Sequence, residues 1–228
     1  LLSPIMGALA DFSGAKKKFL FITYIGCVAA TMLLGLFGPG QYGLAMVCFI
    51  LGYVFFGAGE NFLNAFMPEI ARQKDMGRVS AFSWAIAYTG ALVSMGVGSA
   101  ILATAGEGHL GFGLVCLWCG VYFLVGGLPT FFLLRERKLR EQMPEGQTML
   151  TVGFHRLAQT FREMQHYRHL MRFVLIATIY LAGMSVVIYY AGTIAADEFK
   201  FSTGKQAIFF AQLIVTGIIG AAVIGLVQ

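Results

Sequence analysis

The chain has 228 residues, of which 58% are hydrophobic and 12% are charged, and its mean hydropathy is +0.76. A soluble domain could not cover so much apolar surface, so the composition excludes an ordinary soluble protein and is typical of a helical membrane protein. The net charge of +5 does not indicate a nucleic-acid partner, because the basic residues flank apolar runs, as they do at membrane edges.

Six apolar runs follow one another along the chain, after residues 1–10, which read as the end of an earlier helix. Runs of about 20 apolar residues can cross a bilayer as helices, and their lack of strict alternation excludes a membrane β-barrel. We therefore expect an all-α, multi-pass protein in a lipid bilayer. The predicted spans are residues 19–37, 44–66, 81–105, 114–134, 173–196 and 207–228.

Residues 7–20 read Gly-Ala-Leu-Ala-Asp-Phe-Ser-Gly-Ala-Lys-Lys-Lys-Phe-Leu. This segment resembles the signature of the major facilitator superfamily, Gly-x-Leu-Ala-Asp-Arg-x-Gly-Arg-Lys. In that family the signature joins the second and third membrane helices on the cytoplasmic side. Phe12 and Ala15 stand here at or near the two arginine positions. The structural alternative is a polar turn whose lysines only anchor the helix end at the lipid headgroups. The resemblance implies a conformational role for Gly7, Asp11, Gly14, Lys16 and Lys17.

Glu60 lies inside the second complete apolar run. Burying an ionisable side chain in a membrane costs free energy, so such a residue is by default a candidate for a functional site. Side chains at helical spacing place it in one stripe. In the functional interpretation, the stripe lines a cavity and Glu60 handles solute or protons. In the structural alternatives, Glu60 forms a salt bridge with Arg72 or Arg78, or it lies exposed at the membrane–water interface. The stripe consists of Tyr53, Phe56, Glu60 and Asn64.

Three further segments narrow the resemblance to the vacuole-effluxer-like branch of the superfamily. Residues 64–71 read Asn-Ala-Phe-Met-Pro-Glu-Ile-Ala, residues 77–81 read Gly-Arg-Val-Ser-Ala, and residues 87–90 read Ala-Tyr-Thr-Gly. The branch has Tyr-x-Asp-Gly in its seventh helix, whereas this chain has alanine as the third residue of that motif, at Ala182. Its eukaryotic members are linked to amino-acid efflux from vacuoles. Tyr88 and Tyr180 of these motifs complete the candidate site for substrate or protons.

Lysine and arginine are divided unevenly between the loops. Residues 16–18 contain three, residues 72–78 contain three and residues 135–172 contain eight, against Lys200 and Lys205 in the intervening loops. By the positive-inside rule, the three basic loops are expected in the cytoplasm. In residues 154–171, apolar side chains at helical spacing predict a basic amphipathic helix, lying either on the membrane surface or on the protein itself.

The paired-half architecture of the family implies three parts of a twelve-helix protein. Residues 1–134 would belong to the N-terminal bundle (from the end of helix 2 to helix 6), residues 135–172 would form a cytoplasmic linker, and residues 173–228 would begin the C-terminal bundle (helices 7 and 8). The expected location is the inner cell membrane in a bacterium, or a vacuolar or other organelle membrane in a eukaryote.

The leading functional hypothesis is a secondary active transporter that moves a small solute, with amino acids as one class, by alternating access. The alternative is a transport-inactive scaffold, serving as a subunit of a larger membrane complex; a channel is a weaker third choice. The sequence has no phosphate loop and no His/Asp/Glu cluster with metal-ligand spacing. Cys116 and Cys119 have zinc-like or redox-like spacing but no second pair beside them, so we expect no enzyme, catalytic residue, metal or cofactor. Packing roles are expected for the cysteines and for two stripes of small residues: Cys27, Cys48, Cys116 and Cys119; Gly90, Ser94 and Gly98; Gly217, Ala221 and Gly225.

Overall fold

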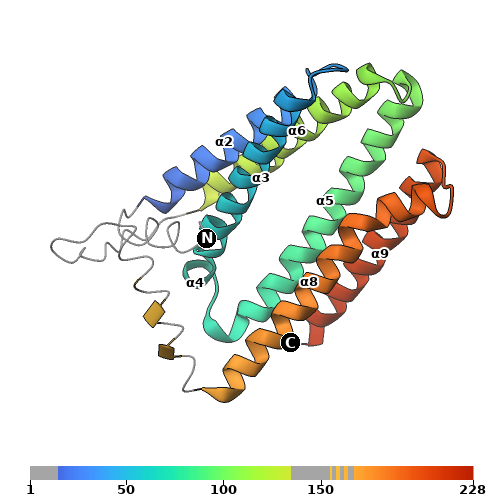
Figure 1. Ribbon diagram of the computed structural model, residues 1–228. Helices are drawn as coiled ribbons and strands as arrows, with labels where there is room; N and C mark the ends of the chain where they lie inside the picture. Colours follow the sequence, from blue (N-terminus) through green and yellow to red (C-terminus); the bar gives the residue numbers. More distant parts are fainter. Residues whose placement is uncertain (1–14, 135–154, 156–157, 160–161, 164–166, 228) are drawn as a thin grey trace.

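The computed structural model describes residues 15–134, 155, 158–159, 162–163 and 167–227, and these residues form helices and turns without strands (Figure 1). Six helical segments are long and apolar enough to cross a membrane. The prediction of an all-α, multi-pass membrane protein is therefore confirmed. The elements are α2 (Lys16–Leu34), α3 (Tyr42–Asn64), α4 (Met67–Ile70), the 3-10 turn η1 (Gln73–Asp75), α5 (Met76–Ala105), α6 (His109–Leu133), α8 (Arg168–Asp197) and α9 (Thr203–Val227).

Several helices begin earlier than the apolar runs predict. α2 begins at Lys16 rather than at residue 19, and α6 begins at His109 rather than at residue 114. A helix satisfies its own backbone groups whatever its side chains are, and lysine can extend its charged end towards water. The helix therefore continues through polar residues that hydropathy assigns to loops.

The prediction of a polar loop at residues 67–80 is wrong in detail. This segment contains α4, η1 and the first residues of α5, which begins at Met76. Pro68 lies in the first turn of α4, where its missing N–H and fixed φ angle are tolerated. The segment is thus a folded connection between α3 and α5.

α2 packs between α3 and α6 through small residues. On the α3 side, Gly52 contacts Ala30 and Gly59 contacts Thr23. On the α6 side, Tyr24 donates a hydrogen bond to the carbonyl oxygen of Phe123 at 3.1 Å. In lipid the hydrophobic effect does not hold helices together, so they associate through the van der Waals packing that close backbone approach permits. A buried hydrophobic cluster near the start of α2 consists of Leu20, Phe62 and Phe66.

α5 joins this group of helices to α9, which in turn contacts α8 (Figure 1). Towards α6, it receives hydrogen bonds from Tyr122 to the carbonyl oxygen of Gly90 (3.0 Å) and from Trp118 to that of Ser94 (3.2 Å). Towards α9, the ring of Tyr88 lies against Gly217. The small-residue stripes on α5 and α9 are therefore interhelical, as predicted.

The helices share two ends, visible in Figure 1. The turn end holds residues 35–41, 106–108 and 198–202, and there the carbonyl oxygen of Phe37 lies 2.8 Å from Nε2 of His109. The basic end holds the start of α2, the α3–α5 connection and the start of α8. Most of the predicted amphipathic helix in residues 154–171 lies outside the described residues.

Candidate functional site

The α3 stripe and the packed face of α3 are distinct. The packed face, which includes Gly52, Gly59 and Phe62, lies against α2. The stripe side chains are exposed, with 59% of Tyr53 and 52% of Phe56 accessible, and Glu60 and Asn64 also exposed. The stripe is therefore not used for packing within the first group of helices.

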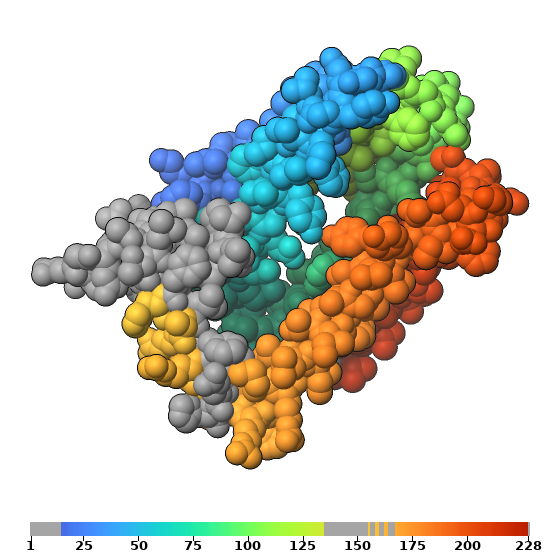
Figure 2. Space-filling model, viewed as in Figure 1, coloured from blue at the N-terminus to red at the C-terminus, as the bar shows by residue number. Residues whose placement is uncertain are grey.

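The stripe faces towards α8. The hydroxyl oxygens of Tyr53 on α3 and Tyr189 on α8 are 3.2 Å apart, within hydrogen-bond distance. Figure 2 shows the molecule hollowed between these two helices, with α5 behind the opening. Residues of one helical face point the same way, so the contact of Tyr53 places the stripe on the side of α3 that borders this hollow.

Glu60 is not held by the arginines that the sequence suggested. Arg72 pairs with Asp75 at 3.1 Å, and the guanidinium of Arg78 lies 5.8 Å from the centre of the Phe82 ring. Within the described part of the chain, Glu60 has no ion pair or hydrogen bond with these side chains. The salt-bridge alternative is not what the structure shows, and Glu60 is an exposed carboxylate on the stripe.

The other two candidate tyrosines lie elsewhere. Tyr88 stacks at an angle on Trp84, with ring centres 5.7 Å apart, and lines a cleft of about 540 Å³ between α5 and α9. Tyr180 precedes Tyr189 by nine residues, which is about two and a half helical turns, so it lies on the opposite face of α8. The structure thus leaves Tyr53, Glu60 and Asn64 on one exposed face of α3 and places Tyr88 and Tyr180 away from that face.

At the basic end, two signature lysines make specific contacts. The Nζ atom of Lys16 is 3.1 Å from Oε1 of Glu69 in α4, and the exposed fractions of the two side chains are 16% and 13%. Lys17 donates a hydrogen bond to the carbonyl oxygen of Leu134, at the end of α6, at 2.9 Å. The start of α2 is thereby tied to both neighbouring connections. The remaining signature residues, Gly7, Asp11 and Gly14, lie outside the described residues.

Sequence reasoning missed both Glu69 and Tyr189. Glu69 belongs to the motif at residues 64–71, and its nearness to a predicted basic loop was the available signal. Tyr189 carried no signal, because it lies in an apolar span 136 residues from Tyr53. Partners that far apart in sequence are found only when the helices are placed in space.

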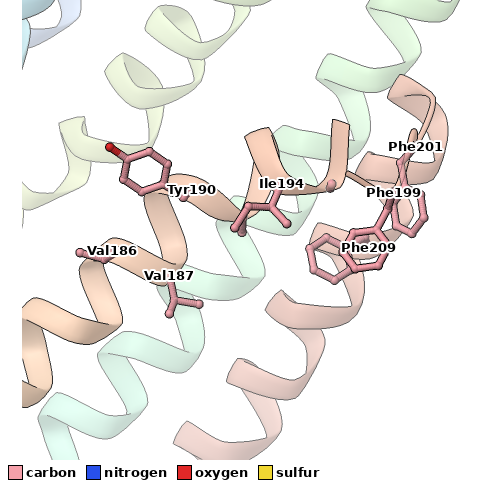
Figure 3. A pocket seen from close by; sticks show the side chains of 9 residues that line it. Val186, Val187, Tyr190, Ile194, Phe199, Phe201 and Phe209 are labelled. Carbon is pink, nitrogen blue, oxygen red and sulfur yellow. The ribbon is translucent and has the colours of Figure 1, made fainter. Parts of the chain in front are cut away.

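A separate cavity of about 410 Å³ lies between α8 and α9 near the turn end and contains none of the predicted site residues (Figure 3). Phe199, Phe201 and Phe209 form its aromatic side, and Tyr190 is its one hydroxyl-bearing residue. Among the described residues, no group of three metal-ligating side chains occurs, and all four cysteines are free thiols.

Two comparisons with known proteins give matches. The family model described as "Vacuole effluxer Atg22 like" matches residues 1–228. A protein of Bacillus subtilis (strain 168), described as the uncharacterized MFS-type transporter YxiO, is 24% identical over 225 residues, which are 94% of this chain and 51% of that protein. The chain therefore spans about half the length of this relative. No solved structure matches.

Proposed function

The chain belongs to the vacuole effluxer Atg22-like family, and on that premise we propose that it is part of a secondary active transporter. The transporter carries a small solute across the membrane by alternating access. Family membership and the MFS-type relative give the chain a multi-pass fold of major-facilitator type. In such folds the solute site lies near the middle of the membrane, between two helical halves.

The observation that carries this proposal is the position of the α3 stripe. Tyr53 contacts α8, Glu60 and Asn64 share its exposed face of α3, and α8 begins the predicted C-terminal half. Within the long helices of the described part, the acidic residues are Glu60, four residues before the end of α3, and Asp197, the last residue of α8. An unpaired carboxylate on an exposed helix face can bind a protonated amine or exchange a proton with solute, which an apolar packing face cannot do.

The test uses the full-length protein in liposomes with an imposed proton gradient. Amino acids are the first solutes to measure, because the branch that the sequence resembles is linked to their efflux. We expect Glu60→Gln to lower the transport rate by at least about tenfold, the effect of losing about 1.4 kcal/mol of solute or proton binding. Glu107→Gln is the matched control, since Glu107 is an exposed acid in the turn between α5 and α6.

Two outcomes would contradict the role of Glu60. One is unchanged transport in both Glu60→Gln and Glu60→Ala together with lower stability, which would make Glu60 a structural residue. The other is an equal loss of transport in Glu107→Gln, which would show that the effect comes from surface charge and not from the stripe.

The second candidate is a transport-inactive scaffold within a larger membrane complex. It is favoured by departures from the family pattern: Phe12 and Ala15 stand at or near arginine positions, and Ala182 replaces an acid. This candidate predicts no transport of any tested solute and purification in a fixed ratio with other membrane subunits. Transport by the purified protein alone would exclude it.

A further inference from the structure

The contact between Tyr53 and Tyr189 lies deep in the helices, away from the surface loops. Tyr53 is eleven residues from the start of α3 at Tyr42, and Tyr189 is eight residues from the end of α8 at Asp197. At 1.5 Å per residue, these separations are about 16 Å and 12 Å from the turn end. These distances from the turn end are close to half the thickness of a hydrocarbon core, which is about 30 Å.

Polar side chains lie on both helices between this contact and the basic end. α3 and α8 run in opposite directions. Both the stretch of α3 from Tyr53 to Glu60 and the stretch of α8 from Tyr189 back to Ser185 therefore extend from the tyrosine contact towards the basic end. Helical spacing places Ser185 and Thr178 on the same face of α8 as Tyr189. Their hydroxyls donate to carbonyl oxygens of their own helix at 2.8 Å, which leaves the oxygens able to accept another hydrogen bond.

The tyrosine pair thus stands at the turn-end limit of a polar stretch shared by two helices. Each hydroxyl can donate and accept, so each can exchange its partner for water or for a solute group. Hydrogen bonds between membrane helices are weak enough to be broken and remade. A weak hydrogen bond between two helices that move relative to one another can close a pathway and still break when the pathway has to open.

We propose that Tyr189 belongs to the solute pathway and that its hydroxyl pair with Tyr53 closes the space between α3 and α8 towards the turn end. When the space opens to that side, the pair separates and both hydroxyls become available to a hydrophilic solute with hydrogen-bonding groups. This inference rests on the proposed transport function, which it extends by a named closing contact and a second pathway residue.

The test measures access from each side of the membrane and does not require a known solute. Full-length protein with its native cysteines replaced carries Ser185→Cys, and a membrane-impermeant maleimide is added to either side of oriented liposomes. We expect labelling from the basic end and little from the turn end. Tyr189→Phe and Tyr53→Phe should each raise turn-end labelling about three- to twentyfold, the factor for losing one interhelical hydrogen bond.

The control and the double variant decide the interpretation. Tyr190→Phe removes a hydroxyl at the next position, on the α8–α9 cavity, and should leave labelling unchanged. Tyr53→Phe with Tyr189→Phe should act like either single variant, because all three remove the same bond. Unchanged turn-end labelling in both single variants, or an equal rise in Tyr190→Phe, would overturn the proposal. A rise in labelling without any measurable transport would support the contact while contradicting the transport function.

Discussion

The ion pair between Lys16 and Glu69 should stabilise the basic end of the protein. Its two side chains are only 16% and 13% exposed, so the pair lies between the solvent-exposed and the fully buried classes. Exposed pairs contribute about 0–1 kcal/mol, and removing one partner of a buried pair costs about 3–5 kcal/mol. We therefore expect Glu69→Gln to lower the free energy of unfolding by about 2 kcal/mol, because it removes the charge of a mostly buried carboxylate that contacts the Lys16 ammonium.

The matched control is Asp75→Asn, which removes the acid of the Arg72–Asp75 pair a few residues further on. That pair has the same 3.1 Å separation, but its side chains are 79% and 39% exposed. Its loss should cost less than about 0.5 kcal/mol. Unfolding is followed for the full-length protein in mixed detergent micelles titrated with sodium dodecyl sulfate, with helix content measured by circular dichroism.

A double variant tests whether the cost of Glu69→Gln comes from this pair. If Lys16 and Glu69 stabilise each other, Lys16→Met combined with Glu69→Gln should cost clearly less than the sum of the two single changes. Equal costs for Glu69→Gln and Asp75→Asn, or strict additivity in the double variant, would refute the reasoning, since burial would then not strengthen the interaction.

Two other predictions concern packing and topology. Gly217→Leu should destabilise the protein by about 1–3 kcal/mol through overpacking, because a Cβ atom added at this position would lie 3.3 Å from the Tyr88 ring. Gly220→Leu should have little effect in the same unfolding assay, because a Cβ atom added there would meet no neighbouring described residue within 4 Å. Single cysteines at Ser13 and Gln147 should react with an impermeant reagent from the same, cytoplasmic side, because the loops that contain them are basic; labelling from opposite sides would exclude the predicted topology.

The sequence by itself determined the membrane class, the number and order of the described spans, and which small-residue faces pack. These are local properties: the length of an apolar run decides whether a helix can cross the bilayer, and glycine at intervals of four permits close approach within one helix face. The faces of Gly90 and Gly217 could therefore be assigned to packing before any helix was placed.

Only the tertiary structure decided which polar groups meet. Lipid is as apolar as the protein interior, so hydrophobic periodicity does not reveal which face of a membrane helix points inwards. Sequence patterns alone therefore could not rank Tyr53, Tyr88 and Tyr180 as site residues. The placement of α8 puts Tyr189 opposite Tyr53, and helical spacing then places Tyr180 on the other face of α8. The pairing of Lys16 with Glu69, 53 residues apart, likewise depends on how the α3–α5 connection folds back to the start of α2. Such contacts arise from the packing of whole helices, which no local pattern encodes.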